Sequence, residues 1–240
     1  MPPSHPFSAE FLTREWPLLR EACSFPRDPA KIAALASEVN DVDSLFQLAE
    51  EHGVIALLAT AVADTSRLTF SPEFLEKLTA RRRMQSVFAL AMSAELFRIL
   101  EMLRSAGIDT VVVKGPVLSF RAYGDSAIRR YADVDMLVRH AEVARVVEVL
   151  TNEGYQSKVP QSAVRSGKIP GEYVFRSPGS QLLFEFHTER TLRYFPRGLP
   201  IDECLARETA VPIQIVLRDQ PVFGGAPGNH RGDPGAARER

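Results

Sequence analysis

Hydrophobic residues recur every three or four positions through the first hundred residues, which predicts a run of helices. The segments with this spacing are 28–39, 41–54, 54–63 and 71–107. Asp41 and Asp43 lie two positions apart at the start of one such segment, where helix capping explains them. The last segment starts with Ser71 and Pro72, a good N-cap and first helical residue. It ends at Gly107 and predicts either one long helix or two.

After Gly107 the hydrophobic spacing changes from a helical period to an alternating one. Short apolar or alternating segments predict strands at 108–115, 131–139, 155–160, 172–177 and 181–189. The first two are expected to be neighbours, and a turn at 177–180 makes the last two a hairpin. Two further segments, 116–124 and 140–154, have the spacing of helices. We predict an α+β fold, a helical N-terminal region followed by a small mixed sheet flanked by helices.

These patterns divide the chain into three parts. The predicted helical region covers residues 1–105, and the predicted α/β domain covers residues 106–215. Residues 221–240 are rich in Gly, Pro, Arg and Ala and have almost no apolar periodicity. Such a segment cannot bury enough apolar surface to offset the entropy of ordering it, so we expect a disordered tail.

The composition excludes several classes of protein. The net charge is −1, with 45% hydrophobic and 25% charged residues, so no bulk basic field attracts nucleic acid. Arg81–Arg83 and Arg129–Arg130 are locally basic, and for the first a solvated helix face is the simpler interpretation. The apolar stretch 54–63 is about half a membrane span. With no signal-peptide pattern and no metal or redox spacing of its two cysteines, we expect a cytoplasmic protein without membrane contact.

Two aspartates stand on one predicted strand. Residues i and i+2 of a strand face the same way, so Asp133 and Asp135 project together, opposite the apolar face. Their charges repel, and a divalent cation bound by both would remove the repulsion. The simpler interpretation is a solvated strand edge, or ion pairs with a nearby arginine, and for two aspartates alone we favour it. The arginines within reach are Arg129, Arg130 and Arg139.

A third carboxylate, on a later strand, favours a bound divalent cation over the simpler interpretation. Glu185 and His187 share one face of the segment 181–189, and two phenylalanines occupy the other. An unpaired acid in the middle of such a strand would be poorly tolerated. Upstream, Gly115 would let the backbone approach a ligand, and the N–H groups of the next helix suit a phosphate. Lys114 is either a phosphate contact or a solvated charge at the strand end.

This arrangement resembles the polymerase beta-like nucleotidyltransferase superfamily, and most closely its bacterial family of uncharacterised nucleotidyltransferases. The family pattern is a lysine–glycine, a tyrosine, an arginine four residues before the first aspartate, an aspartate pair, and an acidic residue two before a histidine. The matching residues are Lys114-Gly115, Tyr123, Arg129, Asp133-Val134-Asp135-Met136-Leu137-Val138 and Glu185-Phe186-His187. The resemblance covers roughly residues 10 to 210. Pro116 replaces the usual second small residue of the loop.

The resemblance implies a Mg²⁺-dependent nucleotidyltransferase that moves a nucleoside monophosphate from an NTP to an acceptor hydroxyl, with Mn²⁺ as the other metal considered. It assigns catalysis and metal binding to Asp133, Asp135 and Glu185. It assigns substrate binding to Lys114, Gly115, Arg129 and His187, although Arg129 also fits an ion pair with the aspartates and His187 a structural role. Members of the family usually continue into a further helical region, whereas this chain turns into the Gly/Pro/Arg tail.

Three other functions compete with this one. The chain could be an inactive relative that binds a nucleotide or a protein, a toxin-like enzyme that modifies tRNA or protein, or a helical interaction module. The residues do not identify the acceptor, and nucleic acid stays among the candidates.

Overall fold

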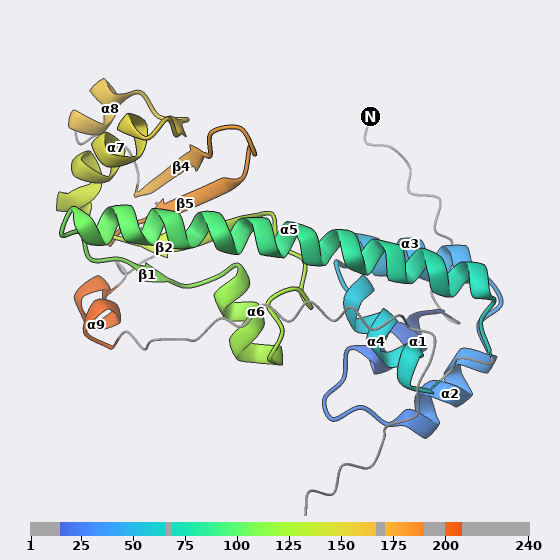
Figure 1. Ribbon diagram of the computed structural model, residues 1–240. Helices are drawn as coiled ribbons and strands as arrows, with labels where there is room; N and C mark the ends of the chain where they lie inside the picture. Colours follow the sequence, from blue (N-terminus) through green and yellow to red (C-terminus); the bar gives the residue numbers. More distant parts are fainter. Residues whose placement is uncertain (1–14, 66–68, 167–170, 190–199, 208–240) are drawn as a thin grey trace, which may run out of the picture.

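The N-terminal part of the molecule is a bundle of short helices. A computed structural model describes residues 15–65, 69–166, 171–189 and 200–207 (Figure 1). The first helices are α1 (Glu15–Ala22), α2 (Pro29–Ser37), α3 (Val42–Glu51) and α4 (Ile55–Thr65). Asp41 accepts hydrogen bonds from the backbone N–H groups of Asp43 and Ser44, which confirms its capping role. Helix α1, only eight residues long and containing Pro17, was not predicted.

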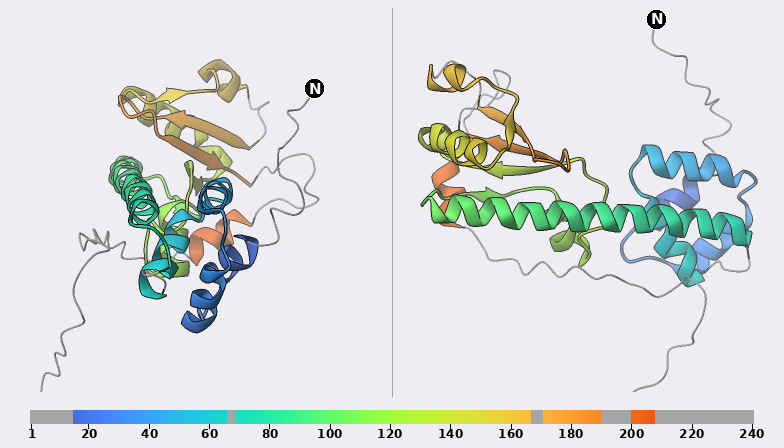
Figure 2. Two further views of the ribbon diagram at one scale, coloured as in Figure 1. Left: turned by 90° about the vertical axis from the view of Figure 1, so that its right-hand side faces the viewer. Right: turned by 45° about the horizontal axis from the view of Figure 1, so that its top comes forward.

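Helix α5 (Pro72–Ser105) is one continuous helix of 34 residues, which settles the choice between one and two. Its length is about 50 Å at 1.5 Å per residue. Ser71 caps it by accepting a hydrogen bond from the N–H of Phe74. Phe74 and neighbouring residues pack with the N-terminal helices, whereas Leu96 and its neighbours pack with the sheet. Helix α5 therefore contributes to both hydrophobic cores. Figures 1 and 2 show it running from the N-terminal helices to the sheet.

The second part of the molecule contains a five-stranded mixed sheet, as predicted. Its strands are β1 (Val111–Val112), β2 (Asp133–Leu137), β3 (Gln156–Ser157), β4 (Glu172–Arg176) and β5 (Leu183–His187). Their order is β1-β2-β5-β4-β3, with β2 parallel to β5 and the other pairs antiparallel. The predicted neighbours β1 and β2 and the predicted hairpin β4–β5 are both confirmed. Strands β1 and β3, at the two edges of the sheet, are shorter than predicted, and each pairs with its neighbour over only two residues.

Helices pack against one face of this sheet, and the last described helix packs against Leu137 on the other. They are α6 (Pro116–Tyr123), α7 (Val143–Asn152), α8 (Gln161–Arg165) and α9 (Ile201–Ala206), with a 3₁₀ turn at His140–Glu142. Helices α5 and α7 pack on one sheet face, where Val134, Met136, Phe184 and Phe186 are fully buried. Helices α8 and α9 were not predicted. The α+β prediction is confirmed, and the division at residues 105 and 215 stays a prediction.

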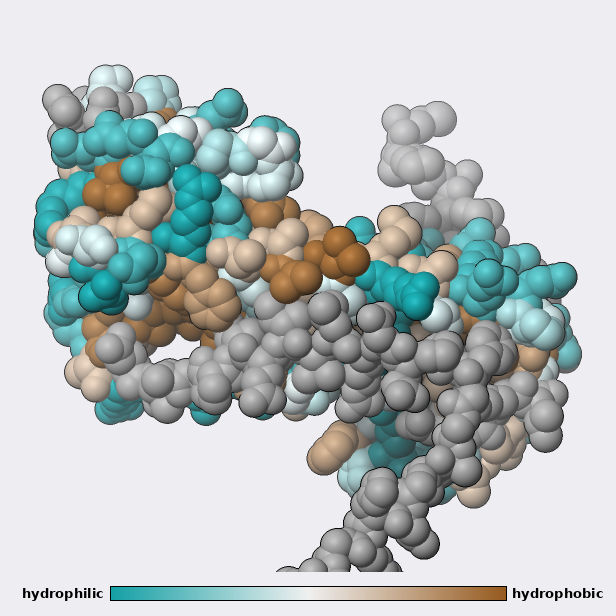
Figure 3. All heavy atoms as spheres, in the orientation of Figure 1, coloured by the Kyte–Doolittle hydropathy of each residue, from teal (hydrophilic) through white to brown (hydrophobic). Residues whose placement is uncertain are grey.

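The outer surface is mixed in character. Figure 3 shows hydrophobic residues gathered over the middle of the face viewed, between more hydrophilic ends. The exposed large hydrophobic residues of α5 are Met84, Val87 and Phe97. Among the described helices, none has the length and apolar content needed to cross a membrane. The tail prediction, residues 221–240, lies outside the described residues.

Candidate active site

Strands β2 and β5 bring three of the predicted residues together. Their parallel register places Asp135 beside Glu185 and Leu137 beside His187. Ligand atoms of Asp135, Glu185 and His187 all lie within 4.8 Å of one another. Asp133 shares the face of Asp135 but pairs with Leu183, at the beginning of both strands. The opposite face of both strands is fully buried, so core packing holds the polar face in position.

Asp135 is the most buried member of this set, with 3% of its surface exposed. Its Oδ1 accepts a hydrogen bond from Lys114 Nζ at 3.0 Å and lies 2.8 Å from His187 Nε2. The same His187 nitrogen is 3.8 Å from Glu185 Oε2. Lys114 therefore contacts the carboxylate directly, an arrangement that neither sequence interpretation of this lysine included.

The arginines named as alternative partners of the aspartates have other contacts. Arg139 bonds to Asp109 and Asp202, and Arg130 donates to the backbone oxygen of Glu50. The Arg129 Nε is buried and has no hydrogen-bond partner among the described residues. Ion pairing of the aspartates with these arginines is therefore wrong for the described structure. Lys114, two residues after the end of β1, forms an ion pair with Asp135.

Glu185 has a raised pKa. Burial of its carboxyl is the main cause, and the charges of Asp133, Glu172 and Asp135 add to it, while His187 acts in the opposite direction. Glu172 was missed by the sequence analysis. It lies directly opposite His187 in the antiparallel β4–β5 pair. Alternation in β4 gives the signal, because Tyr173 and Phe175 are buried and Glu172 must face the polar side.

This raised pKa predicts how metal-free stability depends on pH. The ordinary pKa is 4.5, and the folded value is higher, so an ionised Glu185 costs stability above the folded pKa. That cost disappears as the pH falls through the folded pKa. We expect Glu185→Gln to raise the melting temperature in chelator at pH 7 to 8, and to have little effect near pH 4. Thermal melts across this range would check it, and a difference independent of pH would contradict it.

Gly115 lets the backbone between β1 and α6 approach β2 closely. Its φ is +68°, and an added Cβ would lie 3.0 Å from Val134 Cγ2 and 3.3 Å from the Asp133 carbonyl oxygen. The side chain of Val134 fills the space that a Cβ would need. The glycine predicted to approach a ligand therefore packs against the strand that carries the aspartates.

Gly115→Ala should therefore destabilise the protein by about 2–4 kcal/mol, from a positive φ and a clash together. Gly124→Ala is the matched control, because its φ is +70° and nothing lies within 4 Å of its Cβ position. The control should lose only about 1–2 kcal/mol. Urea unfolding of both variants measures the difference, and equal losses would contradict the packing argument.

The loop between α6 and β2 leads directly to Asp133. The buried side chain of Gln85, from α5, donates to the carbonyl oxygen of Ala127 at 2.6 Å. The N–H of Arg129 donates to Ser119 Oγ at 3.4 Å. These bonds fix the loop on both α5 and α6. Arg129 precedes Asp133 by four residues in this loop. Among the described contacts, none joins the two side chains.

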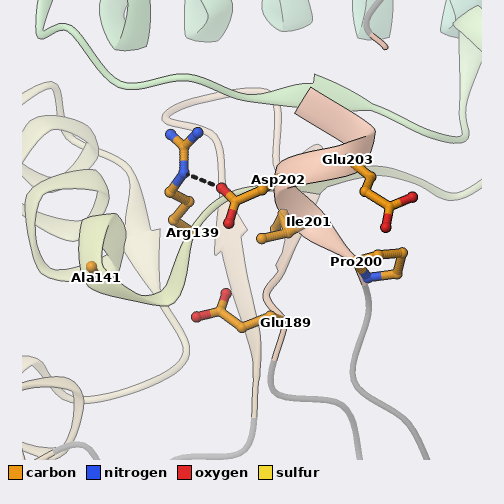
Figure 4. Close-up of a pocket in the computed structure, with 7 residues that line it drawn as sticks. All are labelled: Arg139, Ala141, Glu189, Pro200, Ile201, Asp202 and Glu203. Atoms are coloured by element: carbon orange, nitrogen blue, oxygen red, sulfur yellow. Dashed lines mark hydrogen bonds and ion pairs between the residues drawn. The ribbon is translucent and has the colours of Figure 1, made fainter. Parts of the chain in front are cut away.

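A hollow of about 400 Å³ opens beyond the carboxyl ends of β2 and β5. Glu189 lies two residues after His187, and Arg139 two residues after Leu137. Figure 4 shows Arg139 paired with Asp202, and both face the hollow together with the first residues of α9. Ile201 and Leu205 of α9 pack on Leu137. None of the cluster residues Asp135, Glu185 and His187 lines this hollow, which is formed by the residues that follow β2 and β5 and by the start of α9.

The comparisons with known proteins identify the family of this chain. The family model described as uncharacterised nucleotidyltransferase matches residues 38–223, more than three quarters of the chain. The chain therefore belongs to this family, which confirms the resemblance drawn from the motifs. No curated protein and no solved structure matches the chain.

Proposed function

We propose that this member of the uncharacterised nucleotidyltransferase family uses a divalent cation to transfer a nucleoside monophosphate from an NTP to an acceptor hydroxyl. One observation carries the proposal. Parallel pairing of β2 and β5 places ligand atoms of Asp135, Glu185 and His187 within 4.8 Å of one another, with Asp133 on the same face. Because β2 and β5 are held by a buried core, the cluster does not need a ligand to form.

The donor set fits a divalent cation. Carboxylate oxygens suit Mg²⁺ and Mn²⁺, and an imidazole is also a ligand for transition metals. We assign metal binding to Asp133, Asp135 and Glu185. Bound there, Mg²⁺ or Mn²⁺ would neutralise phosphate charge and polarise the phosphoryl oxygens. The pKa of Glu185 is raised mainly by burial of its carboxyl and further by the charges of the neighbouring carboxylates, and a bound cation would offset both effects.

The other site residues have separate roles in the proposal. His187 orients the Asp135 carboxylate through its Nε2. Glu185, besides holding the cation, would accept the proton of the acceptor hydroxyl. Lys114 and Arg129 contribute positive charge for the phosphates, and the buried, unpaired Arg129 Nε is a donor in need of an acceptor. Gly115 places the start of α6 against β2, although Pro116 removes one N–H that could bind a phosphate.

Lys114→Met should separate cation binding from nucleotide binding. The Lys114 ammonium shares the Asp135 Oδ1 with His187, so it competes with any other cation for that oxygen. Removing it should tighten Mn²⁺ binding by about 2–5-fold, since the lysine is largely exposed and the pair is weak. Nucleotide binding should weaken, because a phosphate-binding charge is lost. Calorimetric titration measures both constants.

The matched control for that experiment is Lys77→Met. Lys77 Nζ lies 2.7 Å from Asp43 Oδ1 on the surface of the N-terminal helices. The substitution therefore removes a comparable ion pair that is away from the site. Neither constant should change in this control. Weaker Mn²⁺ binding in Lys114→Met would contradict the competition described above.

The experiment that tests the function follows a radioactive label. The protein is incubated with each α-labelled NTP, Mg²⁺ or Mn²⁺, and cell extract, and is compared with an Asp133→Ala/Asp135→Ala variant. The proposal expects label in an acceptor with the wild type only. Metal-dependent NTP binding without label transfer would favour an inactive relative, and identical behaviour of both proteins would favour an interaction module. Label in tRNA or protein, with growth arrest on expression, would favour a toxin-like enzyme.

A further inference from the structure

The outer face of helix α5 carries exposed apolar side chains along its middle. Met84, Val87 and Phe97 are 65%, 64% and 47% exposed, and they are three of the seven exposed large hydrophobic residues among those described. Single exposed apolar residues are common on protein surfaces, but several on one helix face are typical of an interaction site. Figure 3 shows hydrophobic residues gathered where Figure 1 shows the middle of α5.

These side chains belong to a regular stripe. Its members follow one another at steps of four, three, four, three and four residues, the heptad spacing of helices that pair side by side. The steps add up to five turns at 3.6 residues per turn, so the stripe follows one line along the helix. This outer stripe consists of Arg83, Val87, Leu90, Ala94, Phe97 and Glu101. All are exposed except Leu90, which is half-buried and belongs to neither of the two cores that α5 joins.

The order of residues along the outer stripe is self-complementary. A two-fold axis level with Met92 would pair two antiparallel copies of α5. Val87 of each copy then lies opposite Phe97 of the other. Leu90 lies opposite Ala94, so a large side chain meets a small one. Met92 itself is fully buried on the inner face of α5, so the axis leaves the helix between Leu90 and Ala94.

Charges at the two ends of the stripe favour the same pairing. The axis places Arg83 opposite Glu101. Arg83 is exposed, and within the described parts of the chain its side chain has no hydrogen bond or ion pair. Glu101 pairs with Arg104 of its own helix but stays 62% exposed, so its carboxylate can accept a second cation. A parallel pair would instead place like charges opposite each other at both ends, which is unfavourable.

We propose that the outer stripe is the interface of an antiparallel homodimer. The occupant is a second copy of this chain, because the stripe complements itself in side-chain size and in charge. Since α5 runs from the N-terminal helices to the sheet, this pairing places the N-terminal helices of one protomer beside the sheet of the other (Figures 1 and 2). The inference concerns assembly and does not depend on the proposed transfer activity.

Sedimentation velocity at increasing protein concentration tests the interface. One helix pair is a small interface, so wild type should move from the 26.7 kDa monomer towards twice that mass only as its concentration rises to ~100 μM. Val87→Glu buries a charge in the pair and should weaken the dimer at least about 30-fold. The monomer of this variant should stay folded, because Val87 is 64% exposed.

Phe25→Glu is the matched control for this substitution. It also turns an exposed apolar side chain into a charge, but in the connection between α1 and α2, where Phe25 is 98% exposed. The dimer should be unchanged in this control.

Charge reversal tests the direction of pairing. At low salt, Arg83→Glu and Glu101→Arg should each weaken the dimer about tenfold, because each replaces two attractive contacts by two repulsive ones. The double variant should recover the association of wild type, since opposite charges face each other again.

The proposal fails in three ways. A wild type that stays monomeric overturns it, whether the stripe is bare or is covered by its own chain or by another protein. A dimer that Val87→Glu leaves intact overturns it, because another surface then makes the contact. Single reversals without effect, or a double variant no better than the single ones, overturn the antiparallel pairing.

Discussion

Asp135→Asn is expected to abolish label transfer and also to lower the stability of the metal-free protein. Asp135 is 3% exposed, and its Oδ1 is in contact with both Lys114 and His187. An asparagine keeps the shape of the side chain but removes the charge that both partners face. We expect a loss of about 1–2 kcal/mol in the free energy of unfolding, limited because Lys114 is largely exposed. Label transfer should fall at least ~100-fold.

Asp133→Asn should separate those two effects. No hydrogen bond or ion pair of the Asp133 side chain occurs within the described ranges, and its charge contributes to the raised pKa of Glu185. Removing that charge relieves a repulsion, so the metal-free protein should be as stable as wild type or slightly more stable. Label transfer should be lost as fully as in Asp135→Asn.

Urea unfolding in chelator and label transfer with metal measure both effects on the same proteins. A clear loss of metal-free stability in Asp133→Asn would indicate that Asp133 has a structural partner. Normal transfer by either variant would remove the aspartates from the proposed mechanism.

Phe186→Ala should give the largest loss of stability, about 3–5 kcal/mol. Phe186 stands between Glu185 and His187 in the sequence of β5, so its side chain points to the opposite face of the strand. There it is fully buried. It packs edge-on against Phe175, with ring centroids 5.5 Å apart. Truncation leaves a cavity under the strand that carries two site residues, so cation binding should weaken as well as stability.

Phe97→Ala is the matched control for this change. Phe97 is 47% exposed on α5, so its truncation should cost less than about 1 kcal/mol and leave cation binding unchanged. Urea unfolding and Mn²⁺ titration of both variants check the pair. A stable Phe186→Ala protein would contradict the role assigned to the buried face.

Local patterns in the sequence were sufficient to predict the two strands of the site. Alternation in YADVDMLV and QLLFEFHTE placed Asp133, Asp135 and Glu185 on polar faces, and the opposite faces are buried as expected. Capping residues marked the start of α5 at Ser71. These features depend on a few neighbouring residues, so a single sequence reveals them.

The contacts between elements could not be predicted in this way. The register that pairs Asp135 with Glu185, and the bond from Lys114 to Asp135, depend on how separate segments pack. Glu172 reaches the site only through the β4–β5 register. Helix α9 is six residues long, too short for a periodic signal, although Asp202 in its first turn is typical of a helix start.

Thermal unfolding with Mg²⁺ or Mn²⁺ and a nucleotide tests the central claim most directly. Wild type is expected to melt about 5–10 °C higher when the nucleotide is present at ~100 times its dissociation constant, because only the folded protein binds it. Asp133→Asn should show no such rise, although its metal-free melting temperature equals or exceeds that of wild type. No rise in wild type, together with a lower metal-free melting temperature in Asp133→Asn, would contradict the metal site.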